Sequence, residues 1–183
     1  MLHTNKAVGY PLASKRRGLA RTAFVAVLAL AFAALAHSST AKLLKQPAPD
    51  FALRSLEGEN LRLSEHLGEV VLVNFWATWC GPCGQEMPAL DELYNKYRRA
   101  GLVLLGVNID DDAVRAAEMA RALKITYPVL FDARKEVSRA YQVGTMPVTV
   151  LIDREGVVRY VSEGYKPGFE KVYAEQLRKL LNE

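Results

Sequence analysis

Two cysteines at the end of an apolar run restrict the folds open to this chain more than any other part of its sequence. The run covers residues 70–75 (Val-Val-Leu-Val-Asn-Phe) and is followed by Trp79-Cys80-Gly81-Pro82-Cys83. It predicts a buried strand, and the spacing of apolar residues after Pro82 predicts a helix. Cys80 and Cys83 are the only cysteines among 183 residues. A Cys-x-x-Cys pair between a strand and a helix is typical of a redox-active dithiol.

The predicted helix start also favours reactivity at the first cysteine. A helix N-terminus has unpaired N–H groups and the positive end of the helix dipole, and both stabilise a thiolate. We therefore expect the pKa of Cys80 to lie below the value of about 8.5 that a free thiol has. Cys83 lies one turn further along the helix, where it can close a disulfide with Cys80.

Two other roles for the cysteine pair have less support. A structural zinc site needs four ligands, and the only histidines in the chain are His3, His37 and His66. A purely structural disulfide across so short a loop would remove little entropy from the unfolded chain. A catalytic dithiol that uses neither a metal ion nor another cofactor is the favoured interpretation.

The residues around the cysteines point to a known group of proteins. Residues 73–83 read Val-Asn-Phe-Trp-Ala-Thr-Trp-Cys-Gly-Pro-Cys, and Glu86-Met87-Pro88 follow. This segment resembles the TlpA/ResA group of thioredoxin-fold proteins, which are exported thiol-disulfide oxidoreductases of bacteria. The resemblance extends from about Pro47 to the C-terminus. It implies an α/β, thioredoxin-like fold: a central mixed sheet flanked by helices, with an N-terminal hairpin and an inserted helix between the second and third core strands.

The residue patterns along the chain agree with these elements. Alternating residues at 51–53 and 61–63 predict the hairpin, and the runs at 70–75 and 102–107, which are largely apolar and do not alternate, predict strands that are buried on both faces. Further strands are predicted at 127–131, 148–153 and 158–161, and helices at 82–100, 113–124, 136–141 and from Gly168 onward. Acidic residues 110–112 are interpreted as a cap of the second of these helices. Tyr160, Tyr165 and Tyr173 are interpreted as packing residues.

The first 36 residues have the pattern of a secretory signal. They contain five Lys or Arg and no acid, and an apolar run at 23–36 ends in Ala34-Leu35-Ala36. This run is short for a membrane span of about 20 residues, and its small residues fit a cleavage site. We expect 1–36 to be a signal peptide or signal anchor, 37–50 a tether and 51–183 one thioredoxin-like domain. The domain would be periplasmic, released by cleavage or tethered to the inner membrane by residues 23–36.

The distribution of charge argues against a nucleic-acid partner. The chain has a formal net charge of +4, and residues 1–36 supply +5, so that residues 37–183 total −1. A nearly neutral domain lacks the basic surface that phosphate binding needs. We expect a monomer that binds no nucleic acid.

The resemblance also implies residues that hold a substrate. In the thioredoxin fold a cis-proline faces the dithiol, and Pro147 matches it, although a trans proline at the start of a strand remains an alternative. The Met146 backbone would then lie beside Cys80 and could pair with an extended substrate segment by strand addition. With Trp79 and Pro82, these residues form the expected substrate-binding set.

A proton acceptor is also needed, because Cys83 must lose a proton when it attacks the sulfur of Cys80. Thioredoxin has a buried Asp six residues before its first cysteine, but that position is Asn74 here, which cannot titrate. Glu86 lies three residues after Cys83 on the same helix face. ResA-like proteins have an acid at this offset, which supports Glu86 as the acceptor. The alternative is that Glu86 only favours the helix N-terminus.

The predicted activity is thiol–disulfide exchange with other proteins. The Gly-Pro pair between the cysteines resembles that of reducing thioredoxins, whose reduction potential is about −270 mV. Strong oxidants have reduction potentials of about −120 mV. The resemblance implies disulfide-containing exported proteins as partners, with apocytochrome c as one candidate, and a membrane electron donor of the DsbD/CcdA type. Two alternatives remain. One is a thiol peroxidase, because peroxiredoxins also have a Thr before the reactive cysteine, as Thr78 is here. The other is a periplasmic metal-binding module that uses His66.

Overall fold

The structure is a computed structural model that describes residues 40–183. The signal peptide or anchor predicted at 1–36 and the first residues of the predicted tether lie outside this range. No helix between residues 40 and 183 is long and apolar enough to cross a membrane.

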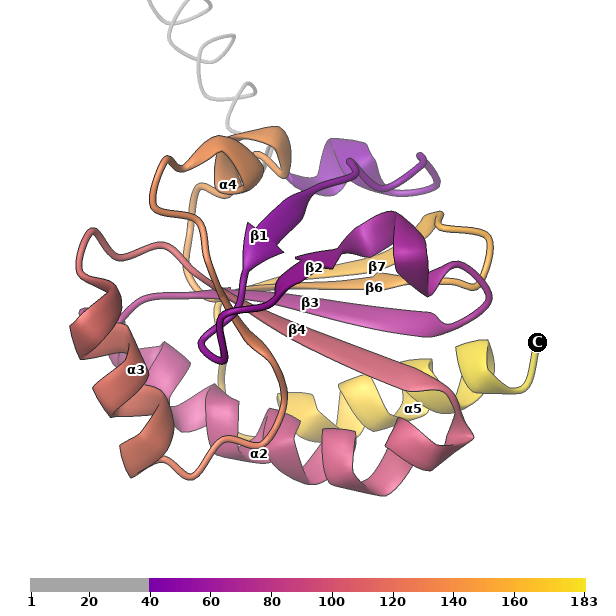
Figure 1. Cartoon of the computed structure of the whole chain (residues 1–183). Helices are drawn as coiled ribbons and strands as arrows, with labels where there is room; N and C mark the ends of the chain where they lie inside the picture. The colour runs from indigo at the N-terminus through magenta and orange to yellow at the C-terminus, as the bar shows by residue number, and fades with distance from the viewer. Residues whose placement is uncertain (1–39) are drawn as a thin grey trace, which may run out of the picture. The chain divides into compact units, whose positions relative to one another are not determined.

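A five-stranded mixed sheet forms the centre of the domain, with the strand order β5-β4-β3-β6-β7 (Figure 1). Strands β3, β4 and β5 run parallel to one another, whereas β6 is antiparallel to β3 and β7 is antiparallel to β6. The strands are β3 (Val70–Trp76), β4 (Leu102–Asn108), β5 (Val129–Phe131), β6 (Val148–Ile152) and β7 (Val158–Glu163). The predicted mixed sheet is therefore confirmed.

The N-terminal hairpin predicted from the sequence is also present, and its surroundings cover both edges of the sheet. Strands β1 (Ala52–Arg54) and β2 (Asn60–Arg62) pair antiparallel. Ser55 bridges to Leu130 on edge strand β5, and Pro47 bridges to Val157 just before edge strand β7. Short 3-10 helices flank the hairpin: η1 (Thr40–Leu43) and η2 (Leu63–His66). Covering edge strands in this way limits pairing with other chains.

The helices connect the strands largely as the sequence predicts. They are α2 (Gly81–Tyr97), the 3-10 helix η3 (Arg98–Ala100), α3 (Ala113–Ala122), α4 (Glu136–Ala140) and α5 (Phe169–Leu181). The inserted helix is α3, which lies between β4 and β5 in the chain and begins at the N-cap Asp112, whose Oδ1 accepts from the Val114 N–H at 2.9 Å. The helix predicted at 82–100 is divided in the structure: α2 ends at Tyr97, and η3 follows it directly.

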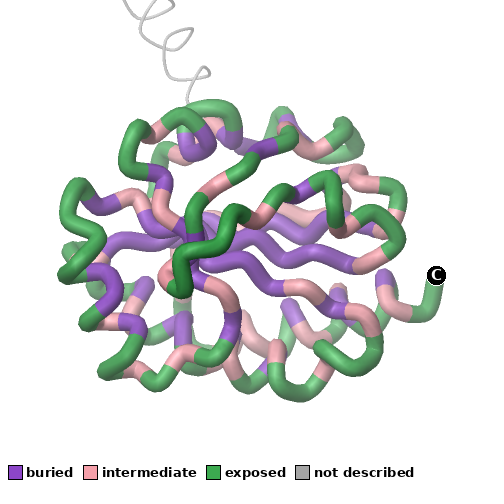
Figure 2. Tube along the Cα trace, viewed as in Figure 1, coloured by how far each residue is buried: buried purple, intermediate pink, exposed green. Residues whose placement is uncertain are grey.

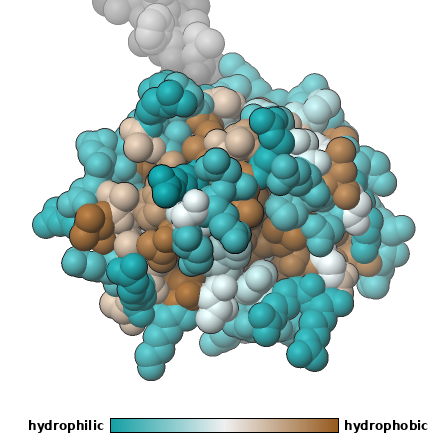
Figure 3. Space-filling view, viewed as in Figure 1, coloured by the Kyte–Doolittle hydropathy of each residue, from teal (hydrophilic) through white to brown (hydrophobic). Residues whose placement is uncertain are grey.

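The sheet has a buried core on each of its faces, and nearly all residues of the central strands are buried (Figure 2). Helices α2, α3 and α5 cover one face, and the hairpin and α4 cover the other (Figure 1). Because side chains alternate along a strand, Val70 and Leu72 belong to the core under α2 and α5. Val71 and Val73 belong to the opposite core. On the side of the domain shown in Figure 3, hydrophilic side chains predominate and apolar patches between them are small.

The same alternation places polar residues in the core beneath α2. Asn74 has the parity of Leu72, so its side chain points toward α2 and α5. In the pairing of β3 with β6, Thr149 is the direct partner of Asn74. On α2, Leu90 and Leu93 are buried, whereas Tyr94 and Tyr97 are half-buried. The rest of the buried face consists of Cys83, Glu86 and Met87.

Candidate active site

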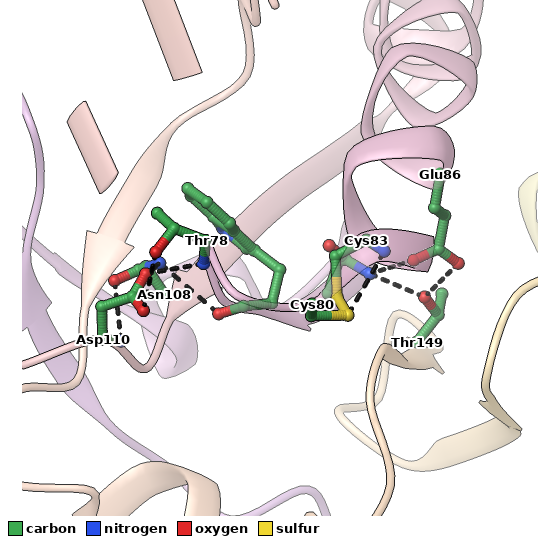
Figure 4. The surroundings of a disulfide bond; sticks show 9 residues. Thr78, Cys80, Cys83, Glu86, Asn108, Asp110 and Thr149 are labelled. Carbon is green, nitrogen blue, oxygen red and sulfur yellow. Dashed lines mark hydrogen bonds between the residues drawn. A yellow bond between two sulfur atoms is a disulfide. The ribbon is translucent and has the colours of Figure 1, made fainter. Parts of the chain in front are cut away.

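Cys80 is the N-cap residue of α2, so the dithiol lies at the start of that helix. Its backbone is extended, with φ −91° and ψ 99°, and its Sγ accepts a hydrogen bond from the Cys83 N–H at 3.3 Å. Pro82 lies in the first turn, where the absence of an N–H costs no helical hydrogen bond. Cys80 and Cys83 are joined by a disulfide (Figure 4). The N-terminus of α2 thus directs the Cys83 N–H toward the first sulfur.

The two cysteines differ in their access to solvent. Cys80 is 6% exposed and Cys83 is 0% exposed. Trp79, directly before Cys80, is 68% exposed, and Pro82 is exposed as well. A partner protein can therefore reach Cys80 before it can reach Cys83.

The loop before β6 contains a cis peptide bond between Met146 and Pro147, the isomer expected from the resemblance. Pro147 is buried, and its carbonyl oxygen accepts a hydrogen bond from the Gly164 N–H at 2.8 Å. Met146 is half-buried and packs against the core cluster that includes both cysteines. The residues expected to hold a substrate thus lie at the same end of the sheet as the disulfide.

Glu86 is fully buried and accepts three hydrogen bonds. Asn74 Nδ2 donates to Glu86 Oε2 at 2.8 Å, and it also donates to Thr149 Oγ1 at 2.9 Å. Thr149 Oγ1 and the Tyr173 hydroxyl both donate to Oε1, at 3.0 Å and 2.8 Å. Figure 4 shows Glu86 and Thr149 pointing toward one another beside the disulfide. Strands β3 and β6 and helices α2 and α5 therefore meet at this carboxyl group.

Burial raises the pKa of Glu86, because a carboxylate loses its hydration inside the protein. Hydrogen bonds from Tyr173, Asn74 and Thr149 oppose this effect on the Glu86 pKa, in that order. The sequence points to Glu86 but not to its donors. Asn74 stands out only as a residue that cannot titrate, Thr149 is not singled out, and Tyr173 is interpreted as a packing residue. Strand parity could have indicated Asn74 and Thr149, but Tyr173 had no comparable signal.

The loop before Cys80 is held by Asp110, at the end of β4 (Figure 4). Asp110 Oδ2 accepts from the Thr78 N–H at 2.8 Å, and Asp110 Oδ1 accepts from the Thr78 hydroxyl at 3.1 Å. Asn108 Nδ2 also donates to Asp110 Oδ2, at 2.8 Å. The interpretation of the acidic run as a helix cap is thus right for Asp112 and wrong for Asp110. The Thr78 hydroxyl, on which the peroxidase alternative depends, bonds with Asp110.

The metal-binding alternative depends on His66, which lies in η2. Its Nδ1 is 3.0 Å from Glu69 Oε2. Within residues 40–183, no group of three or more His, Cys, Asp and Glu side chains is arranged so that it could hold a metal ion.

A mixed sheet between helices, a Cys-x-x-Cys at a helix N-terminus and a cis-proline at the same end of the sheet together define a thiol-disulfide oxidoreductase with a thioredoxin-like fold. The chain belongs to the AhpC/TSA family, which residues 44–161 match. It is 37% identical over 155 residues to the thiol-disulfide oxidoreductase ResA of Geobacillus kaustophilus, an alignment that covers 82% of this chain and 89% of the relative.

Other comparisons agree with this assignment. The thioredoxin-like protein YneN of Bacillus subtilis is 39% identical over 123 residues, which cover 65% of this chain and 71% of that protein. Among solved structures, a Chlorobium tepidum protein assigned as thiol:disulfide interchange protein DsbE is similar, with a TM-score of 0.71 and 35% identity. That similarity covers 74% of this chain and 95% of the other.

Proposed function

We propose that this thiol-disulfide oxidoreductase is exported and reduces disulfides in other exported proteins, with Cys80 as the attacking and Cys83 as the resolving cysteine. The observation that carries the proposal is the place of Cys80 as the N-cap of α2, next to the exposed Trp79. There the helix N-terminus favours a thiolate, and the exposed ring of Trp79 offers a partner a surface directly beside Cys80.

The exchange runs in two steps that transfer one electron pair. The Cys80 thiolate attacks one sulfur of the partner's disulfide, so that a mixed disulfide forms and the partner's other sulfur leaves as a thiolate. The Cys83 thiol then loses its proton and attacks Cys80 Sγ. The Cys80–Cys83 disulfide forms, the second partner sulfur leaves, and the partner takes up protons to become a dithiol.

Glu86 is the proposed acceptor of the Cys83 proton. It follows Cys83 by one turn of α2, and both side chains are excluded from water. Burial raises the pKa of Glu86, which makes its carboxylate a stronger base and brings its proton affinity closer to that of a thiol. The test is the pH profile of cysteine alkylation in Glu86→Gln. An unchanged profile would remove this role from Glu86.

Trp79, Pro82, Met146 and Pro147 are the proposed binding residues for the partner segment around its disulfide. An extended segment could pair with the Met146 backbone by strand addition, since the preceding Gly144 and Thr145 are exposed. This arrangement recognises backbone more than side chains, so it suits an enzyme with several protein substrates.

Export and electron supply complete the proposal. The basic and apolar N-terminal segment favours a periplasmic location, with the domain either cleaved free or held at the inner membrane by residues 23–36. A reductant in an oxidising compartment needs to be reduced again, so a membrane donor of the DsbD/CcdA type is the proposed partner. Apocytochrome c and other oxidised exported proteins are the proposed substrates.

A trapping experiment in the native host tests the central step. In Cys83→Ala the second step is blocked, so we expect mixed disulfides between Cys80 and its substrates to accumulate. They can be purified under non-reducing conditions and identified by mass spectrometry. The matched control is the double variant Cys80→Ala/Cys83→Ala, which should capture nothing. If the single variant yields no more covalent partners than the double variant, exchange with exported proteins is contradicted.

A further inference from the structure

Tyr173 belongs to the last helix of the chain but reaches the polar cluster behind the disulfide. Its hydroxyl donates to Glu86 Oε1 at 2.8 Å, across 87 residues of sequence. The side chain is 1% exposed, and its ring packs edge-to-face on Phe169 with the ring centroids 6.3 Å apart. Core packing therefore restricts the position of this hydroxyl, because close-packed neighbours leave the ring little room to move.

The donors around the Glu86 carboxylate are all uncharged. Asn74 and Thr149 come from the sheet, and Tyr173 comes from α5. Burial has the largest effect on the Glu86 pKa and raises it, and the three hydrogen bonds oppose this rise. Among them, the bond from Tyr173 lowers the pKa most. A hydrogen bond to the charged form of an acid favours ionisation.

The titratable groups around Glu86 allow the role of Tyr173 to be isolated. On α2 the neighbouring group is Cys83, which does not titrate in the disulfide form. Burial, followed by the charge of Glu86, raises the pKa of Tyr173, so its hydroxyl stays a donor throughout the working pH range. Tyr127, before β5, and Tyr165, before α5, also have pKa values raised mainly by burial and in part by the charge of Glu86. Neither of their hydroxyls bonds to Glu86.

We propose that Tyr173 is a positioning residue of the redox centre: from α5 it fixes the Glu86 carboxylate one turn from Cys83 and sets the pH at which that carboxylate can take the Cys83 proton. The inference rests on the proposed role of Glu86 as proton acceptor. It makes the C-terminal helix part of the catalytic apparatus, although α5 contributes no group that touches the reacting sulfurs.

The direct test follows the Glu86 carboxyl carbon by NMR during a pH titration of the oxidised full chain, assigned by its loss in Glu86→Gln. Removing the donor in Tyr173→Phe leaves the ring packing in place, and the titration midpoint should move upward by about one pH unit. Tyr165→Phe is the matched control, because its hydroxyl bonds to Glu170 instead, and it should leave the midpoint unchanged. An unchanged midpoint in Tyr173→Phe overturns the inference.

A second substitution makes the test independent of any loss of stability in Tyr173→Phe. A 3-fluorotyrosine at position 173 keeps the shape of the residue but is a stronger donor, so the Glu86 midpoint should move downward. A downward move supports the inference, and a midpoint that does not respond contradicts it.

The rate of insulin-disulfide reduction against pH separates this inference from the proposed function. If the Glu86 midpoint and the rate profile move together in Tyr173→Phe, both the positioning by Tyr173 and the role of Glu86 as proton acceptor are supported. If the Glu86 midpoint moves but the rate profile stays fixed in both Tyr173→Phe and Glu86→Gln, the role of Glu86 as proton acceptor fails. Its positioning by Tyr173 is supported in that case.

Discussion

Replacing Asn74 with Asp places a second carboxyl group beside Glu86, in a part of the core without access to water. Asn74 Nδ2 lies 2.8 Å from Glu86 Oε2, and both residues are fully buried. Two carboxylates about 4 Å apart repel each other by about 4 kcal/mol at an effective dielectric constant of about 20. The pair will therefore retain one proton near neutral pH, as carboxyl groups that share a site do.

The consequence is a loss of stability that grows with pH. In the folded Asn74→Asp protein the apparent pKa of the pair is raised above the unfolded value of about 4. The stability that depends on the shared proton is fully present below that value and is lost as the pH rises through the folded pKa. Compared with the parent protein, we expect a penalty of about 1.5 kcal/mol at pH 5 and about 4 kcal/mol at pH 8.

The assay is unfolding of the oxidised protein in guanidinium chloride at both pH values, followed by circular dichroism, because the disulfide-bonded cysteines then do not titrate. The matched control, Asn74→Asp/Glu86→Gln, exchanges the carboxyl and amide groups between the two positions. It should recover most of the stability at pH 8. A penalty that is equal at both pH values, or a double variant no more stable than Asn74→Asp, would refute the electrostatic argument.

Two further predictions concern the core and the loop before the dithiol. A Cβ at Gly106 would lie 2.7 Å from the buried ring of Tyr127. Gly106→Ala should therefore lower the free energy of unfolding by about 1–3 kcal/mol. Gly84→Ala should lower it less, because its Cβ would meet only the end of a flexible methionine side chain, at 3.1 Å. Asp110→Ala leaves the Thr78 N–H without its acceptor, so the protein should unfold at a lower temperature and reduce insulin more slowly. Asp110→Asn keeps an acceptor oxygen, so its melting temperature and its rate should fall less. Equal melting temperatures for the two Asp110 variants would contradict the bracing role.

Much of this architecture was predictable because its causes are local. The run 70–75, apolar except for Asn74, has the length and composition of a strand that is covered on both faces, and β3 occupies Val70–Trp76. The first cysteine of the Cys-x-x-Cys pair lies where that run gives way to a helix, which places it at the helix N-terminus. The helix after residue 112 was predictable for the same reason, since its N-cap Asp112 bonds to N–H groups in its own first turn.

Local sequence patterns do not predict contacts between residues that are far apart in the chain. Whether the Met146–Pro147 bond is cis depends on the loop around it, because the intrinsic preference between the isomers is small. Asp110 and Asp112 are the same residue type two positions apart. Asp110 accepts from the loop before Cys80 and Asp112 caps a helix, because only Asp110 lies close enough after β4 to reach Thr78.

The amino-acid sequence by itself determined the dithiol, the strand before it and the helix after it, since short-range periodicity and capping encode these elements. The tertiary structure decided what surrounds Glu86. The register of β6 against β3 brings Thr149 beside Asn74, and the packing of α5 brings the Tyr173 hydroxyl to the same carboxyl group. Pairing and packing over 75 and 87 residues of separation depend on the whole folded core, which no short segment specifies.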